Sequence, residues 1–152
     1  MEQGARRVNF LFFSKNLKIP ALNGHIFLFR DIIGMENKYQ SFETLLIWQE
    51  GMQICYLIYD LLKDCRDFGL KNQMERSAVS IPSNIAEGSG RGSNPDFKRF
   101  LWHSLGSCNE LEYDLQLARE VQFLPSTNHN ALAAQVAEIR RMLTGLVERM
   151  EK

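Results

Sequence analysis

Histidine and cysteine are the residues best suited to metal binding and nucleophilic catalysis, and the chain has three of each. A di-iron helix bundle needs a Glu three positions before a His on two helices, and none of His25, His103 and His129 has one. The cysteines are widely spaced without a CxxC pair, so neither a zinc site nor a disulfide framework is indicated. The sequence therefore predicts no enzyme, no metal and no cofactor.

Two other arrangements contain residues that could in principle act in catalysis. His103 and Cys108 are five apart, so on a helix they point to different sides, and Cys55 and Cys108 lie on apolar stripes, as buried inert thiols do. Glu110 is four residues before Asp114, which would place both carboxylates on one helix face. We interpret that face as solvated.

A glycine cluster, EGSGRGSNPDF over residues 87–97, is the clearest candidate for binding. It leads into a predicted helix N-terminus, where free N–H groups favour an anion. It is neither a Walker loop nor a dinucleotide fingerprint, since no Gly-Lys-Ser/Thr follows and the glycines come after a helix. We favour a helix C-cap with a flexible turn. The alternative is an anion site, and the candidate anion contacts are Arg76, Arg91, Lys98 and Arg99.

Polar residues on or beside inward helix faces form a second set. They are Ser80, Ser83, Asn84 and Glu87 on one predicted helix, and Ser107 and Glu110, with Ser104, on the next. Buried polar groups must be hydrogen-bonded, and such networks often fix helix register. We expect a structural network, with a ligand or nucleic-acid contact as the alternative.

Apolar periodicity predicts the four helices that position these residues. The first carries Leu45, Trp48, Met52, Cys55, Tyr59 and Leu62 on one stripe, with Ile47, Ile54, Ile58 and Leu61 beside it. The second runs from Leu70 to about Glu87 with Leu70, Met74, Ala78, Ile81 and Ile85 inward, and Pro82 should kink or break it. The third, capped by Asn94 with Pro95 at its first position, carries Phe97, Leu101, Ser104, Cys108, Leu111, Leu115 and Ala118. The fourth runs from about Asn128, capped by Ser126 or Thr127, with Leu132, Val136, Ile139, Leu143, Leu146 and Met150.

Four such helices with short connections can bury their stripes only against each other, so the predicted fold is an all-α, antiparallel four-helix bundle. The first helix is apolar on more than one side. We therefore expect subunits to associate around Ile47, Ile54 and Ile58.

Residues 1–34 differ from residues 35–152. They hold five basic and two acidic residues and half of the ten phenylalanines, without sustained periodicity, whereas the remainder holds 13 basic and 16 acidic residues. We interpret them as a poorly ordered extension, or as translated leader before a true start at Met35, rather than a signal peptide. No apolar run is long enough to span a membrane, and the cysteine usage fits a cytoplasmic protein.

The stretches SAVSIPSNIAEGSGRGSNPDFKRFL, GSCNELEYDLQLA and YQSFETLLIWQEG resemble the bacterial four-helix-bundle proteins encoded in intervening sequences of 23S ribosomal RNA genes. The resemblance covers residues 38–152 and implies an up-down-up-down bundle that assembles as a ring-like homopentamer. It also implies kinship with accessory variability proteins of diversity-generating retroelements, which are pentamers that bind nucleic acid and a reverse transcriptase. The intervening-sequence branch has no established activity.

The resemblance has two departures. Residues 1–34 have no counterpart, and the matching body is acidic where the retroelement branch is strongly basic, which argues against strong nonspecific nucleic-acid binding. The leading hypothesis is a noncatalytic oligomeric module that binds RNA or an RNA-associated protein. The alternative is a protein-interaction scaffold accessory to a reverse transcriptase.

Overall fold

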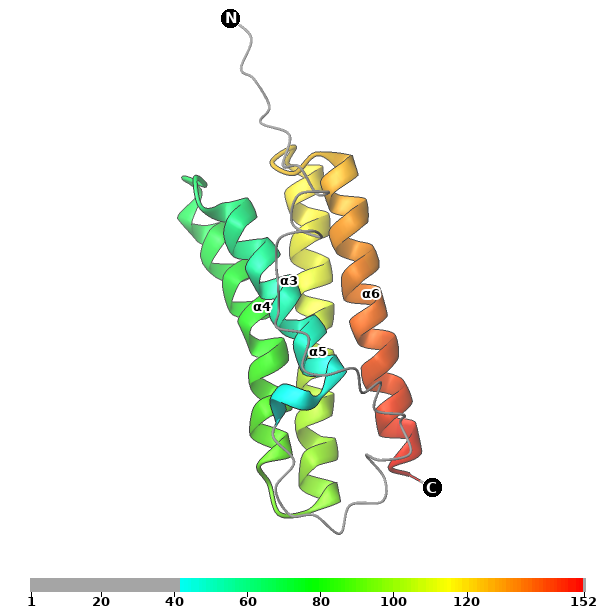
Figure 1. The fold of residues 1–152 in the computed structure, drawn as a ribbon. Helices are drawn as coiled ribbons and strands as arrows, with labels where there is room; N and C mark the ends of the chain where they lie inside the picture. Colours follow the sequence, from blue (N-terminus) through cyan, green and yellow to red (C-terminus); the bar gives the residue numbers. More distant parts are fainter. Residues whose placement is uncertain (1–41, 152) are drawn as a thin grey trace, which may run out of the picture. The chain divides into compact units, whose positions relative to one another are not determined.

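The computed structural model describes residues 42–151, which lie within one compact unit, Asn37–Lys152. A short 3-10 turn, η1 (Phe42–Thr44), precedes four helices: α3 (Leu46–Leu62), α4 (Phe68–Ser89), α5 (Asn94–Glu120) and α6 (Ser126–Arg149). Each helix packs against the next, and α3 also contacts α6, so the four form a bundle (Figure 1). The described residues contain no strand, which confirms the all-α class. Residues 1–34, predicted to be an extension, lie outside the described residues.

Helix starts follow local capping chemistry, with two corrections to the sequence prediction. Asp67 caps α4 by accepting a hydrogen bond from the Leu70 N–H at 3.1 Å. Ser93, rather than Asn94, caps α5, and its hydroxyl accepts from the Asp96 N–H at 3.3 Å. At α6 the cap position is Pro125, with no side-chain cap, because Ser126 is already helical.

The core consists of the stripes predicted for the second, third and fourth helices. Met74, Ala78, Ile81, Leu101, Cys108, Leu111, Leu115, Val136, Ile139 and Leu143 are fully buried. Only the outer members Leu70, Phe97 and Met150 are half-buried. No helix among residues 42–151 is long and apolar enough to cross a membrane.

The inward face of α3 differs from the prediction. Ile54 and Ile58 are fully buried within this one chain and Ile47 is nearly so, so the expectation that subunits cover these three residues is wrong. Both sides of α3 are apolar, and Gly51 helps to decide which one faces the bundle: a Cβ at Gly51 would lie 3.3 Å from the Cβ of Pro82. This close approach turns Trp48, Met52 and Tyr59 toward the outer edge of the α3–α4 interface, where they line an open groove.

Pro82 does not break α4, which runs continuously from Phe68 to Ser89. Proline has no N–H, so the carbonyl of Ala78, four residues earlier, loses its helical donor. The Cys55 thiol donates to that carbonyl at 2.9 Å from α3. The neighbouring helix thus replaces the missing donor.

Candidate functional site

Three of the polar residues selected from the sequence form one hydrogen-bonded group. The Ser80 hydroxyl oxygen accepts from the Asn84 amide at 3.0 Å and from the Ser107 hydroxyl at 2.8 Å, which links α4 to α5. Asn84 also donates to the Ser80 carbonyl at 2.8 Å. Ser83, Glu87 and Glu110 are exposed and lie outside this group.

A buried pair that the sequence analysis missed lies further along the same interface. The Ser77 hydroxyl donates to Asp114 Oδ2 at 2.9 Å, and the Asp114 residue is only 1% exposed. The interpretation of Glu110 and Asp114 as one solvated face is therefore wrong for Asp114. Burial raises the pKa of Asp114, the Ser77 hydrogen bond opposes that rise, and the Glu110 carboxylate adds to it. The signal was present in the spacing, because Asp114 continues the inward series of Ser104, Ser107 and Leu111.

The four basic candidates do not form one positive patch. Arg91 pairs with Glu87, Lys98 Nζ lies 3.3 Å from Glu151 Oε1, and an Arg99 nitrogen lies 3.7 Å from Asp96 Oδ1. These three acids balance the three bases. Arg76 is exposed, precedes Glu87 by 11 residues or about three turns of α4, and lines a separate pocket together with Glu110.

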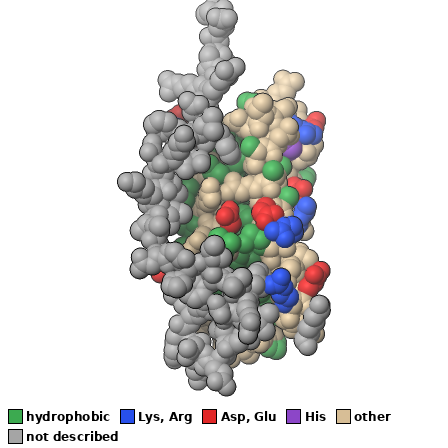
Figure 2. Space-filling model, turned by 45° about the vertical axis from the view of Figure 1, so that its right-hand side comes forward, with side chains coloured by type: hydrophobic (Ala, Val, Ile, Leu, Met, Phe, Trp, Pro, Cys, Tyr) green, Lys and Arg blue, Asp and Glu red, His purple; other side chains and the backbone are tan. Residues whose placement is uncertain are grey.

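One arrangement nevertheless gathers positive charge at the turn between α4 and α5. The Arg91 and Arg99 guanidinium carbons lie 5.0 and 5.3 Å from the centre of the Phe100 ring. Cation–π contact of this kind holds both guanidinium groups close to the Phe100 ring. On the described part of the face shown in Figure 2, basic and acidic side chains lie next to each other instead of forming a broad basic area.

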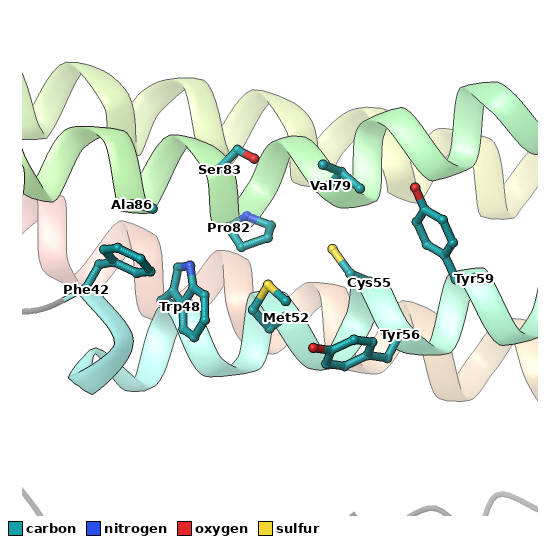
Figure 3. Close-up of a pocket in the computed structure, with 10 residues that line it drawn as sticks. All are labelled: Phe42, Trp48, Met52, Cys55, Tyr56, Tyr59, Val79, Pro82, Ser83 and Ala86. Carbon is teal, nitrogen blue, oxygen red and sulfur yellow. The ribbon is translucent and has the colours of Figure 1, made fainter. Parts of the chain in front are cut away.

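The most distinctive surface is an apolar groove between α3 and α4, with a volume of about 470 Å³ (Figure 3). Its lining residues are Phe42, Trp48, Met52, Cys55, Tyr56, Tyr59, Val79, Pro82, Ser83 and Ala86. Tyr56 and Tyr59 are 52% and 47% exposed, so the groove presents large rings to solvent. Because exposed apolar patches on other proteins often mark interaction sites, this groove is a candidate site.

Cys55 lies against the groove but offers no nucleophile. Burial raises the pKa of its thiol to about 12, and burial also raises that of Cys108 to about 12. Both thiols are therefore protonated near neutral pH and unreactive. Among residues 42–151 no group of three His, Cys, Asp or Glu side chains is placed to hold a metal ion.

A second apolar surface, the α5 ridge, lies on the outer side of α5. It consists of Trp102, Tyr113 and Leu117, which are 54%, 65% and 39% exposed. Gly106 lies between Trp102 and Tyr113 along α5, and a Cβ added at this glycine would have no other atom within 4 Å. The described residues thus include an apolar groove between α3 and α4 and an exposed apolar ridge on α5.

Comparison with known proteins identifies relatives of this fold. The sequence model of the 23S rRNA-intervening sequence protein family matches residues 43–145. A crystal structure from Bacteroides thetaiotaomicron, of a protein with unknown function from the S23 ribosomal protein family, is similar with a TM-score of 0.64 and 24% sequence identity. The similarity covers 67% of this chain and 98% of that one. No curated protein matches the chain.

Proposed function

Because the chain belongs to the 23S rRNA-intervening sequence protein family, we propose that it is a noncatalytic binding module whose copies associate into a closed homo-oligomer. The proposal includes an antiparallel order of α3 to α6 and, following the resemblance described above, five copies per ring. The observation that carries it is the exposed aromatic groove between α3 and α4.

The occupant we propose for the groove is the α5 ridge of a second copy. On α3 the groove extends from Trp48 to Tyr59, which are 11 residues apart. On α5 the two aromatic residues of the ridge, Trp102 and Tyr113, are also 11 residues apart. At 1.5 Å per residue the groove is about 16 Å long on α3, and the whole ridge from Trp102 to Leu117 is about 22 Å long, so the ridge is long enough to lie along the full groove. Contacts between two different surfaces are heterologous, and such contacts close into rings when the rotation permits.

The noncatalytic part of the proposal rests on the described titratable groups. The buried thiols of Cys55 and Cys108 are held protonated. The lining of the apolar groove contains no carboxylate, imidazole or amine, and its polar groups are the indole N–H of Trp48, the thiol of Cys55 and the hydroxyls of Tyr56, Tyr59 and Ser83. Such a lining suits binding of an apolar partner better than acid–base or nucleophilic chemistry.

Light scattering coupled to size exclusion tests the association. Tyr59→Glu in the groove and Trp102→Glu on the ridge each place a charge in the proposed contact, so each variant should lose the oligomer while keeping its helical circular dichroism. Gln53→Glu adds the same charge at an exposed α3 position outside the groove and should keep the wild-type mass. A wild-type chain that is monomeric at micromolar concentration contradicts the proposal.

RNA is a second candidate partner, favoured by the two guanidinium groups that share the Phe100 ring. In a ring, the turn that carries Arg91, Lys98 and Arg99 would recur once per copy, and repetition multiplies a weak contact. The paired acids Glu87, Asp96 and Glu151 reduce the net field. We therefore expect RNA binding at low salt that weakens steeply as salt is added.

The salt dependence of RNA binding can be measured as the retention of a labelled structured RNA by the protein at a series of salt concentrations. Replacing Arg91, Lys98 and Arg99 together with alanine should weaken retention about tenfold or more and flatten its salt dependence. Alanine at Lys63, Arg119 and Arg141 removes the same charge elsewhere and should have a smaller effect. If wild-type protein retains no RNA at low salt, the RNA proposal fails and a protein partner, such as a reverse transcriptase, is favoured.

A further inference from the structure

A second pocket on the described surface has a polar lining, in contrast to the apolar groove. This polar pocket has a volume of about 560 Å³, and its walls include Gln73, Arg76 and Ser77 of α4 and Glu110 of α5. Pockets of this size accommodate a small organic molecule or one long side chain. The groups behind its walls indicate which chemistry would fit.

Asp114 lies directly behind the Ser77 wall and is incompletely hydrogen-bonded. Its Oδ1 atom is buried and has no partner among the described residues. Its Oδ2 atom relies on Ser77, whose one hydroxyl proton faces three acceptors: Asp114 Oδ2 at 2.9 Å, the Gln73 carbonyl at 3.0 Å and the Met74 carbonyl at 3.2 Å. A buried carboxylate that ordinarily needs several donors therefore has one at most.

The charges around the pocket add to this deficit. Glu110 precedes Asp114 by one helical turn and is close enough that its charge acts on the Asp114 carboxyl. Glu75 also lines the pocket, but Lys71 lies 3.7 Å from its carboxylate. In the described part of the chain Glu110 and Asp114 have no basic partner, while Arg76 on the other wall offers a donor for an anion.

We infer that the polar pocket binds a small molecule or side chain that carries a guanidinium or primary ammonium group, with Glu110 and Asp114 as the acceptors. Asp114 is 1% exposed and does not itself line the pocket, so the Ser77 side chain must first swing aside by rotation about its Cα–Cβ bond, and the cationic N–H groups then donate to Asp114. Such charge-assisted hydrogen bonds to a carboxylate are strong, and a guanidinium can bind in bidentate geometry. A carboxylate on the same ligand can pair with Arg76. A free basic amino acid therefore carries both a cation for the acidic side chains and a carboxylate for Arg76.

Titration of the full chain with L-arginine, followed by amide chemical shifts, tests this inference. L-Arginine should shift the amide resonances of Ser77, Glu110 and Asp114. L-Citrulline has the same shape without the guanidinium charge, so its affinity should be lower by about tenfold or more. N-Acetyl-L-arginine amide separates the two sources. If it binds as well as arginine, the ligand is a side chain of a partner, and if only arginine binds, the ligand is a free zwitterion.

Matched variants identify the acceptors. Asp114→Asn and Glu110→Gln should each weaken arginine binding about tenfold, while Glu120→Gln, an exposed position on the same helix, should leave it unchanged. Glu110 is exposed, so its variant keeps the test valid if Asp114→Asn disturbs folding. Equal binding of arginine and citrulline, unchanged binding in both acceptor variants, or no shift at millimolar arginine would each overturn the inference and leave the pocket as a water site.

Discussion

Gly88 marks the closest approach near the turn between α4 and α5. A Cβ at this position would lie 2.6 Å from the Cβ of Phe100 and 2.8 Å from a ring carbon of Phe97. The first of these atoms is fixed to the α5 backbone and cannot turn aside. Gly88→Ala therefore forces the two helices apart, and forced overpacking costs about 1–3 kcal/mol.

Replacing Gly88 with alanine also raises helix propensity, which stabilises the protein and offsets part of the clash. A control variant with the same gain in propensity but no clash is therefore needed. Gly145 lies inside α6 with nothing within 4 Å of an added Cβ. Gly145→Ala should stabilise by up to about 1 kcal/mol, because alanine favours the helix over glycine by that amount. Gly88→Ala gains the same propensity, so the difference between the two variants isolates the clash.

Urea unfolding followed by circular dichroism at one protein concentration measures that difference. The free energy of unfolding should be about 1–3 kcal/mol lower for Gly88→Ala than for Gly145→Ala. Holding the concentration fixed removes the contribution of association. Equal stability of the two variants would refute the close packing of α4 on Phe100.

Three further predictions concern the polar interface and the N-terminal segment. Asn84→Leu removes one donor to the Ser80 hydroxyl, but Ser107 still donates to it, so the free energy of unfolding should fall by about 1 kcal/mol. A fall of more than about 3 kcal/mol would contradict the view that Ser107 still satisfies Ser80 in the variant. Because the pKa of Asp114 is raised in the folded state, this carboxyl should lower wild-type stability as pH rises through that pKa, so the free energy of unfolding of Asp114→Asn should increase relative to wild type from acidic to neutral pH in paired urea titrations. A variant whose free energy of unfolding decreases relative to wild type over this range would contradict the raised pKa. Deleting residues 1–34 should leave the thermal midpoint nearly unchanged, because the core residues from Leu45 to Val147 pack within the described helices; a fall of several degrees would contradict this.

Much of the fold followed from the sequence because its signals are local and repeated. The stripes of α4, α5 and α6 are built from steps of three and four residues, and a helix with one apolar face buries that face against the core. The resemblance to the intervening-sequence proteins, based on residues around Pro82 and Gly88, is confirmed by the family match over residues 43–145. Periodicity alone could not orient α3, because Ile54 and Trp48 lie on two apolar sides of one helix.

The site was harder to predict because it depends on contacts between distant residues. Ser77 and Asp114 are 37 residues apart, and neither is unusual by itself in a helix. The basic residues of the glycine turn were identifiable, and the acids that pair with Arg91 and Arg99 are only four and three residues before them. The partner of Lys98 could not be identified in this way, since Glu151 is 53 residues away along the chain. A count of the basic residues alone therefore overstated the positive field at Arg91 and Arg99.

Mixing two interface variants tests the groove-to-ridge contact most directly. Tyr59→Glu chains keep an intact ridge and Trp102→Glu chains keep an intact groove, so each variant alone should be monomeric. A mixture should form one contact per pair and no more, which light scattering would record as a dimer. A mixture that stays monomeric, or variants that each retain the wild-type oligomeric mass, would contradict the proposed contact.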